Sequence, residues 1–186
     1  MAKPDLYSNA RDPRPRTHPT PDPMLRATAY AECPPSLQLA VAEALLTEWP
    51  QDFAMQNVTT PEGVRQVFLK NYDTWKATKS VFFVFTDPAA QRGAPAFIGT
   101  ISLEYSLTAT YAPCIANVYV AAKLRRFGFG SVLVTFAERF LKRQALSAAY
   151  LWCDPGLAGY YEKRGYKVVE VPTGGYKEVR FMGKSL

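Results

Sequence analysis

The segment 123–131, Lys-Leu-Arg-Arg-Phe-Gly-Phe-Gly-Ser, limits the folding of this chain more than any other feature. A β-branched apolar run at 115–120 precedes it and predicts a buried strand. Apolar side chains follow it at helical spacing, namely Phe129, Leu133, Phe136, Ala137 and Phe140. The two glycines therefore open a helix, where unpaired amides and the helix dipole favour an anion. We expect the turn to bind a phosphate through its main-chain N–H groups.

Two other glycine motifs fit this turn less well. A dinucleotide-binding fingerprint needs a small residue at the position of Leu133 and an acidic residue near Tyr150, and neither is present. A P-loop needs a lysine between its last glycine and the hydroxyl residue, but Ser131 follows Gly130 directly. For the glycine pair alone, a purely structural role between strand and helix stays open.

A second segment, Tyr-Tyr-Glu-Lys-Arg-Gly-Tyr at 160–166, predicts a short helix that ends at a glycine and leads into an apolar strand. Together, the pattern RxxGxG at 125–130 and this segment resemble the GNAT superfamily of acetyl-CoA-dependent N-acetyltransferases. The resemblance covers about residues 97–171, with the two motifs in the family's order and about thirty residues apart.

The resemblance implies a place for the cofactor acetyl-CoA. The first motif would bind the pyrophosphate of coenzyme A through Arg125, Arg126, Phe127, Gly128, Phe129, Gly130 and Ser131. Backbone groups of Val118, Tyr119 and Val120 would contact the acetyl and pantetheine groups. Asp154 stands where many members have an asparagine, so it either bonds cofactor or substrate or caps the next helix.

The resemblance also implies catalytic residues. Tyr161 matches the family's tyrosine, and a phenol with a pKa of about 10 stays protonated to protonate a thiolate whose pKa is about 8.5. The base is less defined, because the position of a family glutamate holds Cys114. Glu104 is the nearest alternative acid, and a chain of waters is another. Buried strand cysteines such as Cys114 and Cys153 are usually inert, which disfavours a ping-pong route.

Composition predicts one folded unit. Six prolines interrupt the first 24 residues, which carry few large apolar side chains. We expect 1–24 to form a disordered or draped arm and 25–186 a single domain.

The sequence also predicts which partners the protein binds and where in the cell it lies. No apolar run reaches the roughly 18 residues of a membrane span. Three scattered cysteines argue against a disulfide framework and favour the cytoplasm. The net charge of +6 is not gathered into one patch, so we expect no nucleic acid partner. The only histidine, His18, lies in the proline-rich arm, so we expect no metal site.

The elements expected along the chain alternate between helix and strand. Helices are expected at 36–49, where Pro50 ends the helix, from Thr60, from Gly128 and near Tyr161. Strands are expected at 25–31, 80–86, 96–105, 115–120, 149–153, 166–171 and 177–182. This order predicts a mixed α/β fold. The resemblance implies a mostly antiparallel sheet that splays between its fourth and fifth strands, flanked by helices.

The acceptor stays open at this level. The resemblance implies a primary amine, on a small molecule or a peptide N-terminus, and a protein that is a monomer or homodimer. A basic rim would suit an acidic peptide or a phosphosugar, whereas acidic residues in the cleft would suit a polyamine or an arylalkylamine. A different class of function is an acetyl-CoA sensor or scaffold without catalysis, which the thiol at Cys114 favours.

Overall fold

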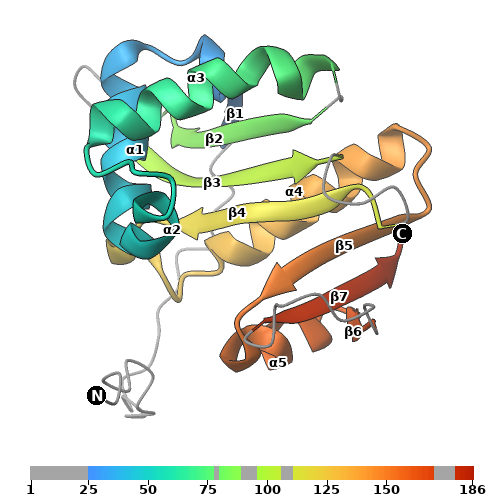
Figure 1. The fold of residues 1–186 in the computed structure, drawn as a ribbon. Coiled ribbons are helices and arrows are strands. Elements are labelled where there is room, and N and C mark those ends of the chain that lie inside the picture. The colour runs from blue at the N-terminus through green and yellow to red at the C-terminus, as the bar shows by residue number, and fades with distance from the viewer. Residues whose placement is uncertain (1–24, 78–79, 89–95, 106–110, 170–178) are drawn as a thin grey trace.

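The computed structural model describes residues 25–77, 80–88, 96–105, 111–169 and 179–186, so the predicted arm at 1–24 lies outside the described residues. These ranges form one twisted sheet of seven strands with helices on both of its faces (Figure 1). The strands are β1 Arg26–Ala29, β2 Val81–Asp87, β3 Ala96–Glu104, β4 Cys114–Val120, β5 Ala148–Cys153, β6 Lys167–Val168 and β7 Arg180–Ser185. The helices are α1 Pro35–Glu48, α2 Pro50–Ala54, α3 Pro61–Ala77, α4 Phe129–Arg143 and α5 Ala158–Glu162.

The sheet has the order β1-β2-β3-β4-β5-β7-β6. Strands β1 to β4 pair antiparallel, and β5, β7 and β6 do the same in a second group. A single parallel pairing between β4 and β5 joins the two groups. The predicted mixed α/β fold, with a mostly antiparallel sheet that opens between its fourth and fifth strands, is confirmed.

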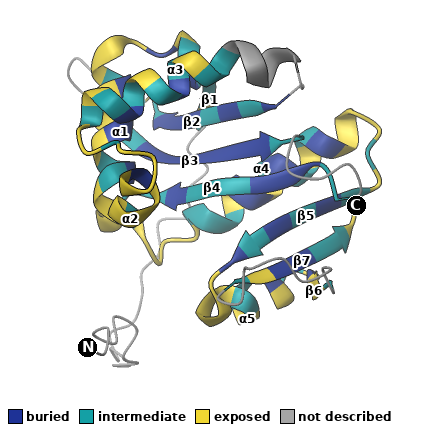
Figure 2. Ribbon diagram, viewed as in Figure 1, coloured by how far each residue is buried: buried dark blue, intermediate teal, exposed yellow. Residues whose placement is uncertain are grey.

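Two apolar clusters cover the two faces of the sheet. Helix α4 buries Leu133, Val134, Ala137 and Leu141 against one face, at the helical spacing seen in the sequence. Helices α1 and α3 bury Val41, Leu45, Val64 and Phe68 against the other face. Figure 2 shows the buried positions concentrated in the central strands and on the helix surfaces that cover them.

Several element boundaries differ from the sequence prediction. The strand expected at 166–171 covers only Lys167–Val168 of the described residues. The first strand ends at Ala29, because the chain turns there and buries the ring of Tyr30. Pro50 ends α1 as expected but also begins α2, since proline suits the first turn of a helix. The last strand runs over 180–185 rather than 177–182. Its register is set by Phe181, which lies opposite Trp152 and stacks on Tyr150 at 5.7 Å.

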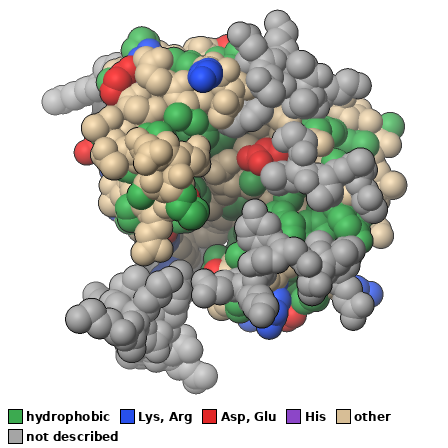
Figure 3. Space-filling view, in the orientation of Figure 1, with side chains coloured by type: hydrophobic (Ala, Val, Ile, Leu, Met, Phe, Trp, Pro, Cys, Tyr) green, Lys and Arg blue, Asp and Glu red, His purple; other side chains and the backbone are tan. Residues whose placement is uncertain are grey.

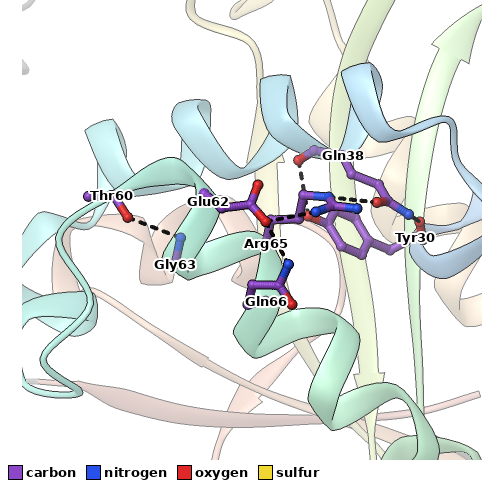
Figure 4. Close-up of polar contacts among 7 residues, drawn as sticks. All are labelled: Tyr30, Gln38, Thr60, Glu62, Gly63, Arg65 and Gln66. Carbon is purple, nitrogen blue, oxygen red and sulfur yellow. Dashed lines mark hydrogen bonds and ion pairs between the residues drawn. The ribbon is translucent and has the colours of Figure 1, made fainter.

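A polar latch, the hydrogen-bonded group Tyr30, Gln38 and Arg65, joins α1 to α3 next to the end of β1 (Figure 4). The Gln38 side chain, 4% exposed, donates from Nε2 to the Tyr30 carbonyl at 3.1 Å. Its Oε1 accepts from Arg65 Nε at 3.0 Å, and Arg65 also pairs with Glu62 at 2.8 Å. The buried amide is therefore bonded at both ends, which fixes how the two helices cross.

Replacing Gln38 with alanine is expected to lower the free energy of unfolding by about 1–3 kcal/mol, because it removes the hydrogen bonds of a buried amide to the Tyr30 carbonyl and to Arg65. The matched control is Gln66→Ala on the exposed side of α3, whose amide bonds only exposed Glu62. That change should stay within about 0.5 kcal/mol. Urea denaturation measures both, and equal effects would show that the latch contributes nothing.

Candidate functional site

A wedge opens between β4 and β5. The strands pair only at Cys114 with Tyr150 and at Ile115 with Leu151; beyond Ile115, β4 stays paired with β3 up to Val120, and no described strand pairs with its other edge. A cavity of about 330 Å³ lies at this opening. Its described walls are Trp49 and Asp52, residues 115–118 of β4, residues 152–154, Leu157, Tyr161 and Val179. The edge of β4 that faces β5 therefore presents its backbone to a cavity large enough for a small organic molecule.

A bulge shapes the β4 wall of this cavity. The pairing of β3 with β4 skips a residue between Thr100 and Ser102, and Asn117 adopts a φ of 49°. Asn117 Nδ2 donates to Ser102 Oγ at 2.9 Å and to Glu104 Oε1 at 3.0 Å. Thr100 Oγ1 donates to the Asn117 carbonyl at 2.8 Å. Side chains of β3 thus hold the bulge in a conformation that costs free energy outside glycine.

The loop before α4 leaves a row of amides open. Arg126 and Gly128 have φ values of 69° and 89°, which turn the chain sharply into the helix. Within the described ranges, no backbone carbonyl accepts a hydrogen bond from the N–H groups of 126–130, whereas Ser131 N donates to Gly128 O at 2.9 Å. Five adjacent donors at the positive end of a 15-residue helix are an arrangement that favours a negative charge.

The two glycines of the loop serve different purposes. Gly128 supplies the left-handed conformation, and a Cβ there would meet no atom within 4 Å. Gly130 supplies space, because a Cβ there would lie 2.9 Å from the hydroxyl of Tyr160 in α5. Helix α5 therefore packs directly against the first turn of α4.

Tyr161 places a phenol side chain in the wall of the cavity. The residue is 6% exposed and lines the cavity beside Leu157 and residues 152–154. Burial raises its pKa further above the ordinary phenol value, with neighbouring Tyr160 and Cys153 adding to the effect. The phenol therefore keeps its proton throughout the physiological pH range.

A family model described as the acetyltransferase (GNAT) family matches residues 40–166, which is more than half of the chain. The chain belongs to this GNAT family. A Bacillus subtilis (strain 168) protein that carries an acetyltransferase name is 38% identical over 53 residues. That match spans 28% of this chain and only 36% of the relative.

Solved structures share the fold of this GNAT chain. An acetyltransferase from Streptococcus agalactiae 2603 superposes with a TM-score of 0.61 at 13% identity, covering 87% of this chain and 98% of that chain. An aminoglycoside 6'-N-acetyltransferase complexed with coenzyme A gives 0.61 at 15%, covering 86% and 96%. The PaiA N-acetyltransferase from Thermoplasma acidophilum, in complex with coenzyme A, gives 0.55 at 15%, covering 87% and 99%. The family's fold is therefore kept at low sequence identity.

The predicted site residues of this GNAT chain fall into two groups around the wedge. Val118 and Tyr161 line the cavity, and residues 126–131 form the loop and the first turn of α4. The Tyr119 ring instead packs in the α1 core, 6.2 Å from Trp49 and stacked on Phe97 at 5.9 Å, so only its backbone faces the wedge edge.

Asp154 combines a structural role with a place at the cavity. Its carboxylate accepts from Gly156 N at 2.7 Å and caps the turn Pro155–Leu157, one of the two roles that the sequence left open. The same residue lines the cavity. The cap therefore fixes a carboxylate at the wedge.

Glu104, the predicted base, and Cys114, at the position of the family glutamate, both have raised pKa values. Burial raises the pKa of Glu104, and hydrogen bonds from Ser102 and Asn117 partly oppose that effect. Cys114 lies opposite Glu104 across β3 and β4, and burial raises its thiol pKa to about 12, with nearby Glu104 adding to it. The thiol therefore stays protonated at neutral pH. Glu104 reaches the cavity through Asn117, which lines it.

Two arginines near the loop, Arg125 and Arg164, have different partners. The guanidinium of Arg125 bonds the Val120 carbonyl at 3.0 Å and pairs with Glu48 at 2.6 Å, so it ties α1 to the end of β4. Arg164, which sequence reasoning missed, donates to Ser131 Oγ and lies over the Tyr160 ring at 3.5 Å. The contact joins residues 33 positions apart, and no local pattern marks it.

The described ranges hold neither a metal-binding cluster nor a membrane-spanning helix. No group of three or more His, Cys, Asp or Glu side chains there is arranged to hold a metal ion. No helix in those ranges has the length and apolar character required to cross a bilayer. His18 lies outside the described residues.

Proposed function

We propose that this GNAT protein moves the acetyl group of acetyl-CoA to the nitrogen of a primary amine by direct attack. The observation that carries the proposal is the wedge between β4 and β5, which has open amides of the α4 loop near one end and Tyr161 in its wall. Two relatives of the same fold are complexes with coenzyme A, which supports the choice of cofactor.

The residues of the loop fit a diphosphate. Five amides at 126–130, from which no described backbone carbonyl accepts a hydrogen bond, supply donors, and the bare Cα of Gly130 makes room for the Tyr160 hydroxyl beside the first turn of α4. Arg164, bonded to Ser131, adds a positive charge beside the same turn. Acetyl-CoA supplies an acetyl group activated as a thioester. Residues 126–131 would hold its diphosphate, and the unpaired edge of β4 would hold its pantetheine arm.

The chain's own groups then handle charge and protons. Backbone N–H groups of the bulged strand near Val118 stabilise the negative charge that grows on the acetyl oxygen. As the nitrogen–carbon bond forms and the carbon–sulfur bond breaks, Tyr161 gives its proton to the departing sulfur. The amine loses a proton to Glu104 through water, while the Asn117 amide holds the carboxylate by a hydrogen bond, and that proton returns to solvent and then to Tyr161.

An acceptor screen tests the proposal. The protein is incubated with acetyl-CoA and a library of primary amines, and mass spectrometry reports which amines gain one acetyl group. At least one amine should be acetylated by the protein and none in its absence. Tight acetyl-CoA binding without transfer to any amine would instead support the sensor or scaffold, which the protonated thiol of Cys114 favours because it offers no base.

Replacing Glu104 with glutamine is expected to lower kcat/KM about tenfold at neutral pH and less at alkaline pH, where the amine is already neutral. The acidic limb of the wild-type profile should lie above the ordinary Glu pKa of about 4.3, because burial raises the pKa of Glu104. Glutamine keeps an oxygen that accepts from Ser102 and Asn117. An unchanged pH–rate profile would remove Glu104 as the base.

Unfolding free energies supply the control for this variant. The raised pKa means that the folded state binds the Glu104 proton more tightly than the unfolded chain does. The resulting stability is full below about pH 4 and is lost as the pH rises through the folded-state pKa. Glu104→Gln should therefore become more stable relative to wild type between about pH 4 and about pH 8. A variant that loses stability equally at both values would be damaged rather than deprived of a base.

A further inference from the structure

We infer that the acceptor is a small, positively charged amine with an apolar body of about aromatic size, rather than a phosphosugar or an acidic peptide. The inference rests on the proposed function and names the substrate class of the same site. Three features of the wedge cavity carry it: its size, the aromatic rings in its walls, and the sign of the charges around it.

The size of the cavity favours a compact acceptor. Its volume of about 330 Å³ lies at the low end of small-molecule sites, and the acetyl end of the donor has to share it. Trp49, at the end of α1, and Trp152, in β5, both line the cavity, and Leu157 and Val179 add aliphatic surface. Such walls bind a flat apolar body of one ring better than a hydrated sugar.

The charges around the cavity favour a cation. Asp52 and Asp154 are carboxylates in its walls, and the described lining includes no Lys, Arg or His. Glu104 adds a third carboxylate behind Asn117. The guanidinium of Arg125, at the end of β4, is already paired with Glu48. Figure 3 shows this distribution of charge on the molecular surface: the described Lys and Arg side chains on this face lie away from its central hollow.

An ammonium group at this site gains from two kinds of neighbour. The carboxylates attract it, and the faces of Trp49 and Trp152 stabilise a cation through their π electrons. A phosphate or carboxylate on the acceptor would instead meet carboxylates without a described cation in the wall to balance it. The preference is therefore for an acceptor whose only charge is its amine.

A matched pair of amines tests the inference directly. 2-Phenylethylamine and phenylalanine share the ring and the amine and differ by one carboxylate. Steady-state kinetics with acetyl-CoA should give a kcat/KM at least about tenfold higher for 2-phenylethylamine, which corresponds to about 1.4 kcal/mol. Glucosamine 6-phosphate and a peptide with an acidic N-terminus should be poorer still. Equal or better turnover of phenylalanine or the phosphosugar would overturn the inference.

Asp52→Asn should reduce the preference for 2-phenylethylamine about threefold, because it removes one exposed charge from the wall and keeps the shape. The matched control is Glu43→Gln, an exposed acid on α1 that does not line the cavity and changes the net charge equally. An equal effect of the two variants would show that the preference reflects overall charge, and the acceptor class assigned to the wedge would be wrong.

Binding separates a failure of this inference from a failure of the proposed function. With coenzyme A present, titration of each amine is followed by calorimetry. Stronger binding of 2-phenylethylamine than of phenylalanine, without acetylation of these or any other amine of the library, would sustain the amine class and sink the catalytic proposal. Acetylation of other amines, with no preference between this pair, would sustain catalysis and sink the amine class.

Discussion

Replacing Tyr161 with phenylalanine is expected to lower kcat at least about a hundredfold while leaving the affinity for acetyl-CoA unchanged. The change removes only the hydroxyl, and the ring that packs in the wedge wall stays in place. Because burial raises the phenol pKa, the hydroxyl is protonated whenever the sulfur departs. Steady-state kinetics give kcat, and calorimetry with acetyl-CoA gives the affinity.

Tyr160→Phe is the matched control for this variant. Its hydroxyl is buried beside Gly130 with no hydrogen-bond partner in the described residues, so its removal should leave kcat and stability nearly unchanged. A wild-type kcat in Tyr161→Phe would remove Tyr161 from the mechanism. A large loss of kcat in Tyr160→Phe would reassign the proton donor to the neighbouring residue.

Replacing Gly130 with valine is expected to weaken acetyl-CoA binding about tenfold to a hundredfold, the equivalent of one or two charge-assisted hydrogen bonds. A Cβ at this position would lie 2.9 Å from the Tyr160 hydroxyl, so the Tyr160 side chain or the first turn of α4 has to shift. A shift of that first turn displaces open amides of the loop, which include the amide of Gly130 itself. Calorimetry with acetyl-CoA measures the loss, and thermal unfolding verifies that the variant is folded.

The control for this variant is Gly159→Ala. Gly159 directly precedes Tyr160 in α5, and a Cβ there would meet no atom within 4 Å. Acetyl-CoA affinity should therefore match the wild type. If Gly130→Val bound acetyl-CoA as tightly as Gly159→Ala did, the loop before α4 would not be the diphosphate site.

Much of the scaffold of the site was predictable because its signals are local. The left-handed turn at Gly128 and the apolar spacing of α4 lie within one short stretch of sequence. The cap at Asp154 is local too, since it joins residues two positions apart. The opening of the sheet between its fourth and fifth strands was predicted from the family resemblance rather than from any one segment.

The rest of the site depends on contacts between distant segments. The Asn117 side chain reaches Glu104 from a strand 13 positions later, and Arg164 reaches Ser131 across 33 positions. The ion pair between Arg125 and Glu48 could not be predicted from the motif around Arg125, because the two residues are 77 positions apart. Pairwise contacts of this kind follow from how the sheet brings segments together, and propensity and spacing do not encode them.

Hydrogen–deuterium exchange with and without acetyl-CoA tests the central claim most directly, because the claim concerns particular backbone amides. Saturating acetyl-CoA should slow exchange at 126–130 and along the free edge of β4 at 116–120, and should leave α3 unchanged. Binding measured by calorimetry without protection at either stretch would contradict the account.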